Sequence, residues 1–142
     1  MEEKIKKLNK IFYLDKEINR LKNRIDELSV LSSAGFDKEM SGVGGVSDPV
    51  SKFALKKIEL LELLNESLEK RIDEEIKVRK FINSIDDIEM RSIIELRFIL
   101  KKTWDEIASE LSPDDKYVHR TTFIKKFNKF IQNSHISLYD VL

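Results

Sequence analysis

Apolar residues in the first part of the chain recur at alternating spacings of three and four. They define three heptads with isoleucine at each a position and leucine at each d position: Ile11, Leu14, Ile18, Leu21, Ile25 and Leu28. This combination favours a two-stranded coiled coil. Ile5 and Leu8 do not fit the register. We therefore predict a coiled-coil-like helix over residues 1–33.

A glycine-rich segment follows this helix. All four glycines of the chain lie between Ser32 and Ser51, together with Pro49. About twenty such residues exceed the usual length of a connection in a compact domain. We predict a flexible loop over residues 34–50.

Helical spacing resumes after the loop and predicts a second long helix over residues 51–83. Its apolar positions include Ile58, Leu61, Leu68, Ile72 and Ile76, and Asn65 occupies an a-like position in the same pattern, where a buried amide can fix the register of a coiled coil. Two arrangements of the helices remain open: an antiparallel hairpin with the glycine-rich segment at its tip, or pairing of the first helix with its copy. We expect a homo-oligomer, with a dimer favoured, because a lone two-helix hairpin buries little surface.

Residues 84–133 show the pattern of three shorter helices. Asp86 and Glu89 have the spacing of a capping pair, and they open a helix that runs towards Leu100. A second capping box, Thr103 to Glu106, opens a short helix with an apolar stripe of Trp104, Ile107, Ala108 and Leu111. Turn residues follow at 112–115.

The third of these helices begins near His119, and its apolar positions predict an inward face of Phe123, Phe127, Phe130 and Ile131. A short middle helix followed by a basic last helix is typical of a helix-turn-helix. The predicted fold class is all-α: a long helical arm pair followed by a C-terminal three-helix helix-turn-helix domain over residues 84–133. Residues 134–142 are predicted to form a C-terminal tail.

Composition supports this interpretation and excludes several classes of function. Charged residues make up 37% of the 142 residues, with only four glycines and two prolines, as expected for surface-rich helices. The absence of cysteine excludes disulfides, thiolate metal sites and cysteine nucleophiles. No secretory signal or membrane-length apolar run is present, so we expect a cytoplasmic protein. No set of residues suggests catalysis, a cofactor or a metal site, and we expect no enzymatic activity.

Charge is distributed unevenly despite a formal net charge of zero. Residues 116–133 contain five basic residues and no acidic one. With the phenylalanines inward, the opposite face of the last helix carries threonine and lysine, which suit base edges and phosphate oxygens respectively. The candidate DNA-binding residues are Lys116, His119, Arg120, Thr121, Thr122, Lys125, Lys126 and Lys129.

Three stretches of the chain carry a family resemblance: Leu96-Arg97-Phe98, Thr103-Trp104-Asp105-Glu106-Ile107-Ala108 and His119-Arg120-Thr121-Thr122-Phe123. They resemble the region-four helix-turn-helix of sigma factors and, more closely, phage-encoded late-transcription regulators of the RinA and ArpU type and related prophage proteins. The resemblance covers about residues 40–131. One departure is the connection from Leu111 to His119, which is longer than the family's tight turn.

This resemblance implies sequence-specific binding of double-stranded DNA and control of transcription, in some members through contact with RNA polymerase. It places Thr121, Thr122 and Lys125 at positions that read the major groove, on a recognition helix of about residues 119–132. It places Arg120 and Lys126 at positions that meet phosphates.

Two other functions remain open at this stage. One is a small DNA-packaging subunit that resembles a terminase small subunit and assembles as a ring of eight or more chains. The other is a protein-interaction adaptor that contacts RNA polymerase without reading DNA, which the acidic pair Asp114-Asp115 favours.

Overall fold

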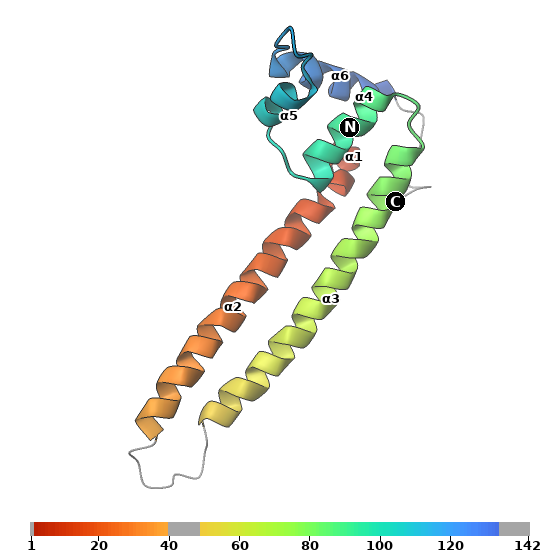
Figure 1. The fold of residues 1–142 in the computed structure, drawn as a ribbon. Coiled ribbons are helices and arrows are strands. Elements are labelled where there is room, and N and C mark those ends of the chain that lie inside the picture. Colours follow the sequence, from red (N-terminus) through yellow and green to blue (C-terminus); the bar gives the residue numbers. More distant parts are fainter. Residues whose placement is uncertain (1, 40–48, 134–142) are drawn as a thin grey trace. The chain divides into compact units, whose positions relative to one another are not determined.

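The computed structural model describes residues 2–39 and 49–133, and the side chains of residues 2–31 and 51–133. Every regular element in this part of the chain is a helix, which confirms the predicted all-α class (Figure 1). None of the described helices combines the length and apolar character that a membrane crossing requires. The elements are α1 (Glu2–Leu8), α2 (Lys10–Glu39), α3 (Pro49–Asn83), α4 (Ile88–Ile94), η1 (Glu95–Ile99), α5 (Trp104–Leu111) and α6 (Arg120–Asn133).

The chain divides into two compact units. Among the described residues, the first unit comprises 2–13 and 71–133, and the second comprises 14–39 and 49–70. The first unit is therefore larger than the predicted domain of residues 84–133, because it includes the N-terminal turns and the end of α3. Helices α2 and α3 each contribute to both units.

The N-terminal segment forms two helices. The prediction of one continuous helix over residues 1–33 is therefore wrong. Helix α1 ends at Leu8, and α2 begins at Lys10. Leu8 and Ile11 are both completely buried in the core of the first unit, with Ile5 packed against it. The break accounts for the failure of Ile5 and Leu8 to fit the heptad register: these residues belong to a separate helix.

In the second unit, α2 and α3 run antiparallel and pack through apolar side chains (Figure 1). The buried residues of this contact are Ile18 and Ile25 of α2 and Leu64 of α3. The isoleucine positions of the first heptad pattern are thus covered within one chain. The prediction that the Asn65 amide is buried is wrong for the single chain. Leu64 packs against α2, and Asn65 is exposed.

The ends of the predicted glycine-rich loop also differ from the structure. Helix α2 continues to Glu39, and α3 already begins at Pro49. One glycine within a long helix costs only about 1 kcal/mol relative to alanine, and proline is favourable at the first helical position. The rest of the predicted loop, residues 40–48, and the predicted tail, residues 134–142, lie outside the described residues.

Helix α4 begins after Asp87, which replaces the predicted Asp86 as the capping residue. The Asp87 carboxylate accepts hydrogen bonds from the backbone N–H groups of Glu89 (3.0 Å) and Met90 (3.3 Å). This start sets the phase of the helix so that Met90, Ile93 and Ile94 are buried. The cap satisfies two N–H groups that a helix start otherwise leaves unpaired.

The predicted helix towards Leu100 changes its winding at Glu95. Residues 95–99 form a π-helical turn, η1, in which Leu100 N donates to Glu95 O at 3.0 Å. Two residues after the end of η1, Lys101 has a φ of 57°, in the left-handed region. Lys102 N then donates to Leu96 O at 2.8 Å and closes the helix end.

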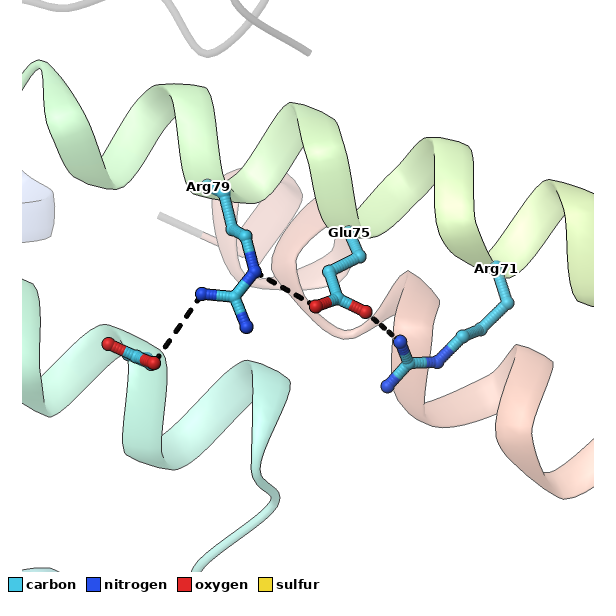
Figure 2. A network of polar contacts seen from close by, with 4 residues as sticks. Arg71, Glu75 and Arg79 are labelled. Atoms are coloured by element: carbon cyan, nitrogen blue, oxygen red, sulfur yellow. Dashed lines mark hydrogen bonds and ion pairs between the residues drawn. The ribbon is translucent and has the colours of Figure 1, made fainter.

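A polar network joins the end of α3 to η1 (Figure 2). Figure 2 shows the carboxylate of Glu75 between two guanidinium groups: it accepts from Arg79 Nε at 2.9 Å and pairs with Arg71. Arg79 Nη1 also lies 3.4 Å from the Glu95 carboxylate. Burial favours the neutral form of Glu75, but the hydrogen bonds and charges of the two arginines outweigh it and lower the pKa of this carboxyl.

Candidate nucleic-acid interface

Helix α6 has one face fixed in the core of the first unit. Phe123, Phe127 and Ile131 are buried there, as predicted from their spacing, whereas the fourth predicted residue, Phe130, is only partly buried. The Phe127 ring lies 5.5 Å from the Phe98 ring and 5.7 Å from the Trp104 ring, measured between centroids. These contacts fix the rotation of α6 about its own axis. The orientation of its outer face is therefore determined.

All eight predicted DNA-binding residues are exposed. Seven of them lie on α6 or directly before it, and Lys116 lies in the connection from α5. The residues are Lys116, His119, Arg120, Thr121, Thr122, Lys125, Lys126 and Lys129.

The start of α6 is capped by His119. Its Nδ1 accepts a hydrogen bond from the backbone N–H of Thr121 at 3.3 Å and lies 3.0 Å from the Thr121 hydroxyl. An accepting Nδ1 requires the ring proton to be on Nε2, so the Thr121 hydroxyl donates to Nδ1. The His119 carbonyl accepts from Thr122 N at 3.0 Å. His119 and Thr121 therefore stabilise the helix start, and α6 begins at Arg120, next to the predicted position.

The long connection between α5 and α6 is closed at its base by one hydroxyl. Ser112 Oγ accepts from Val118 N at 2.9 Å and donates to the carbonyl of Ala108 in α5. Within the connection, Lys116 N donates to Pro113 O at 3.1 Å. The connection is long, but its two ends are held together.

The start of α5 carries the predicted capping box. Glu106 N donates to Thr103 Oγ1 at 3.2 Å, and Thr103 N donates to the Glu106 carboxylate at 2.7 Å. The bond from Thr103 N lowers the pKa of Glu106, because it favours the charged carboxylate. Arg97 lies 5.3 Å from the centre of the Trp104 ring and donates to Lys102 O at 3.0 Å, so the start of α5 is tied to η1.

Two of the predicted basic residues form ion pairs within the same unit. Arg120 Nη1 lies 3.1 Å from Asp105 Oδ2, and Lys126 Nζ lies 2.6 Å from Glu89 Oε1. All four side chains are about half exposed, and such pairs contribute little to stability. They do place a negative charge beside two of the expected phosphate contacts. Sequence analysis did not indicate either contact, because Asp105 lies 15 residues from Arg120 and Glu89 lies 37 residues from Lys126.

Three of the candidate lysines have no ion pair among the described residues: Lys116, Lys125 and Lys129. Thr122 lies about one helical turn before Lys125, and Lys129 lies about one turn after it. This spacing places the three residues on one exposed side of α6. We call this surface, which has no ion pair among the described residues, the α6 basic face: Thr122, Lys125 and Lys129.

The other end of α6 is held by a residue that the sequence pattern did not indicate. Lys4 of α1 donates from Nζ to the carbonyl of Ile131, in the last turn of α6, at 3.2 Å. A cation is favourable at the negative end of a helix. The two residues are 127 positions apart, so no local signal could have revealed the contact.

An open groove lies between the start of α4 and the outer side of α6. Its lining mixes acidic, basic and apolar groups: Asp87, Glu89, Met90, Lys126, Lys129, Phe130 and Asn133. Within the described ranges, no three histidine, aspartate or glutamate side chains are grouped so that they could hold a metal ion. The α6 basic face therefore remains the feature with the clearest chemical preference, which is for anionic oxygens.

Comparison with known proteins adds no relative: no protein-family model, curated protein or solved structure matches this chain.

Proposed function

We propose that this chain is a cytoplasmic DNA-binding protein of the helix-turn-helix class that regulates transcription, as the phage and prophage regulators that its sequence resembles do. The observation that carries the proposal is the α6 basic face, which is exposed and free of acidic partners among the described residues, on a helix whose opposite face is fixed in the core. The proposal involves no catalytic step and no cofactor.

In the proposed complex, α6 lies in the major groove of double-stranded DNA. The helix has 14 residues and is about 21 Å long, and the major groove, about 12 Å wide, admits an α-helix. Thr122 and Lys125 face base edges, and Lys129 and Lys116 meet phosphates. Arg120 and Lys126 reach phosphates only by exchanging the carboxylates of Asp105 and Glu89 for phosphate oxygens.

The test is fluorescence anisotropy with labelled duplexes of different sequence, each about three helical turns long, titrated near 50 mM and near 200 mM salt. The variant is Lys125→Glu with Lys129→Glu. The matched control is Lys52→Glu with Lys56→Glu, which makes the same charge change at the same spacing on an exposed part of α3.

We expect the α6 variant to lose binding at both salt concentrations and the α3 variant to bind as the unaltered chain does. Binding that differs between duplexes at the higher salt concentration would support base readout. Equal weakening by both variants would contradict the assignment of the α6 basic face, because general charge would then account for binding.

A second function, an adaptor that binds a protein such as RNA polymerase, is favoured by one observation. The ion pairs of Arg120 and Lys126 neutralise two cations that a DNA-binding face would use. This function predicts no binding to any duplex at either salt concentration, together with retention of RNA polymerase on the immobilised chain.

A further inference from the structure

Helix α3 carries two neighbouring apolar rows within the second unit. The inner row, which includes Leu60 and Leu64, packs against α2. The other row, which we call the outer seam, consists of Ile58, Leu61, Asn65 and Leu68. The two rows are offset by one residue, or about 100° around the helix, so α2 covers the first and leaves most of the second in solvent.

The outer seam is apolar although it is exposed. Ile58 is 52% exposed, Leu61 is 40% exposed, and only Leu68, at the border with the inner row, is partly buried against α2. The spacing continues along the sequence to Ile72, which is 54% exposed. A row of exposed apolar residues at heptad spacing is typical of a helix that pairs with another helix.

We propose that the outer seam of α3 pairs with the same seam of a second copy of this chain, in parallel and in register. Within the seam, isoleucine occupies the a position 58 and leucine occupies the d positions 61 and 68, and the sequence has isoleucine again at the following a position, 72. Among parallel coiled coils, isoleucine at a with leucine at d favours two helices over larger assemblies. The remaining a position is Asn65, and in a parallel pair the two copies of Asn65 face each other and hydrogen-bond, which fixes the register.

The flanking charges select the same orientation. Lys57 occupies the g position before the seam, and Glu62 occupies the following e position. In a parallel dimer, each g residue lies near the e residue of the partner's next heptad, so Lys57 and Glu62 attract each other twice. An antiparallel dimer instead brings e near e and g near g, so Glu62 approaches Glu69 in one register, and Lys57 approaches Arg71 in the register shifted by one heptad. Both of those contacts are repulsive.

The small core of the second unit supplies a reason for pairing. Among the described side chains of this unit, the buried apolar residues are Ile18, Ile25, Leu28 and Leu64. Two helices that bury so few residues gain little free energy from packing. A second copy on the outer seam would cover Ile58, Leu61 and Asn65, and the coiled-coil core would then contain both rows of α3.

The oligomeric state of the full chain tests this proposal, measured by sedimentation equilibrium and light scattering at micromolar concentrations. We expect a dimer, and we expect Leu61→Lys to raise its dissociation constant by about 100-fold or more, because two lysines lose water at the seam. Leu63→Lys is the matched control: Leu63 is 49% exposed on the same helix but lies at the f position, away from the seam. We expect this control to remain dimeric. Circular dichroism should show equal helix content in both variants.

A cysteine in place of Asn65 tests orientation and register, and needs no folding comparison. The chain has no cysteine of its own, so Asn65→Cys and Leu63→Cys each introduce a single thiol. Facing a positions in a parallel pair lie within the reach of a disulfide. We expect Asn65→Cys to form a covalent dimer on mild oxidation and Leu63→Cys to stay monomeric under denaturing electrophoresis.

Several results would overturn the proposal: a monomer or an assembly of eight or more unaltered chains, a dimer that tolerates Leu61→Lys, or no cross-link at position 65. The proposal is independent of DNA binding, since neither experiment contains DNA.

Discussion

The guanidinium of Arg120 lies 3.1 Å from the carboxylate of Asp105, so the first residue of α6 is bound to the first turn of α5. Both side chains are at least half exposed. A phosphate that approaches the start of α6 therefore meets a cation whose charge is already partly compensated. The pair holds the two helices of the proposed DNA-binding region together and also limits how strongly that region attracts an anion.

Replacement of Asp105 by asparagine should strengthen DNA binding. We expect the affinity for duplex DNA at low salt to rise by about three- to tenfold, because one repelling charge is removed beside Arg120. The free energy of unfolding should change by less than about 1 kcal/mol, as for most exposed ion pairs. Anisotropy titration and urea denaturation measure the two effects. Asp26→Asn removes an exposed acid from α2 and is the control; an equal gain in that variant would contradict a local effect at Arg120.

Truncation of Phe127 should weaken the first unit substantially. Its ring is buried between Phe98 and Trp104, so Phe127→Ala should lower the free energy of unfolding by about 3–5 kcal/mol. Trp104 is the sole tryptophan of the chain, and its fluorescence during urea denaturation reports directly on this contact. Phe130→Ala, at a partly buried position of the same helix, should cost less. Equal losses in the two variants would contradict the described core.

Removal of the Thr103 hydroxyl should destabilise α5 through its cap. The hydroxyl accepts from Glu106 N, and Thr103→Ala leaves that N–H without its partner. The expected loss is about 1 kcal/mol, measured by thermal unfolding followed by circular dichroism. Ser109 is exposed in the same helix and makes no side-chain hydrogen bond in the described part of the chain, so Ser109→Ala should have little effect. A cap that contributes nothing would give the same melting temperature in both variants.

Glu75 should make the stability of the first unit depend on pH in the acid range. The pKa of Glu75 is lowered from its ordinary value of 4.5, so the unfolded chain binds this proton more readily than the folded chain does. Its contribution to stability is present above that ordinary value and is lost as the pH falls through the lowered pKa. Glu75→Gln should therefore reduce stability near neutral pH and flatten the loss between about pH 5 and pH 3.

Urea denaturation at a series of pH values checks this expectation, with Glu59→Gln, an exposed change on α3, as the control. If Glu75→Gln left the acid limb of the stability curve as steep as before, the network of Figure 2 would not be the source of the dependence.

The parts of the fold that sequence analysis predicted are those determined by neighbouring residues. The Thr103–Glu106 capping box and the inward phenylalanines of α6 depend on spacings of three and four, which the sequence displays directly. The cap of α4 was placed one residue early because Asp86 and Asp87 are both suitable capping residues. Burial of Met90, a tertiary effect, decides between them.

The parts that sequence analysis missed depend on contacts between distant segments. The residues around Lys126 in the sequence do not indicate its ion pair with Glu89. Those around Ile131 do not indicate that its carbonyl accepts from Lys4. On α3 the regular heptad row contains Asn65, but α2 packs against the less regular row that contains Leu64 and Ser67. A helix with two apolar rows does not reveal from its own sequence which row its neighbour covers.

The Ser112 hydroxyl has a consequence for how this region tolerates change in length. The hydrogen bond between Ser112 and Val118 closes the connection at its base. The residues between these two form a loop tip that does not itself link α5 to α6. Asp114 and Asp115 lie in that tip, outside the closure and before Lys116, the proposed phosphate contact. Insertions there would lengthen the tip without altering the angle between α5 and α6, which makes this segment a suitable place to attach a fluorescent or affinity label.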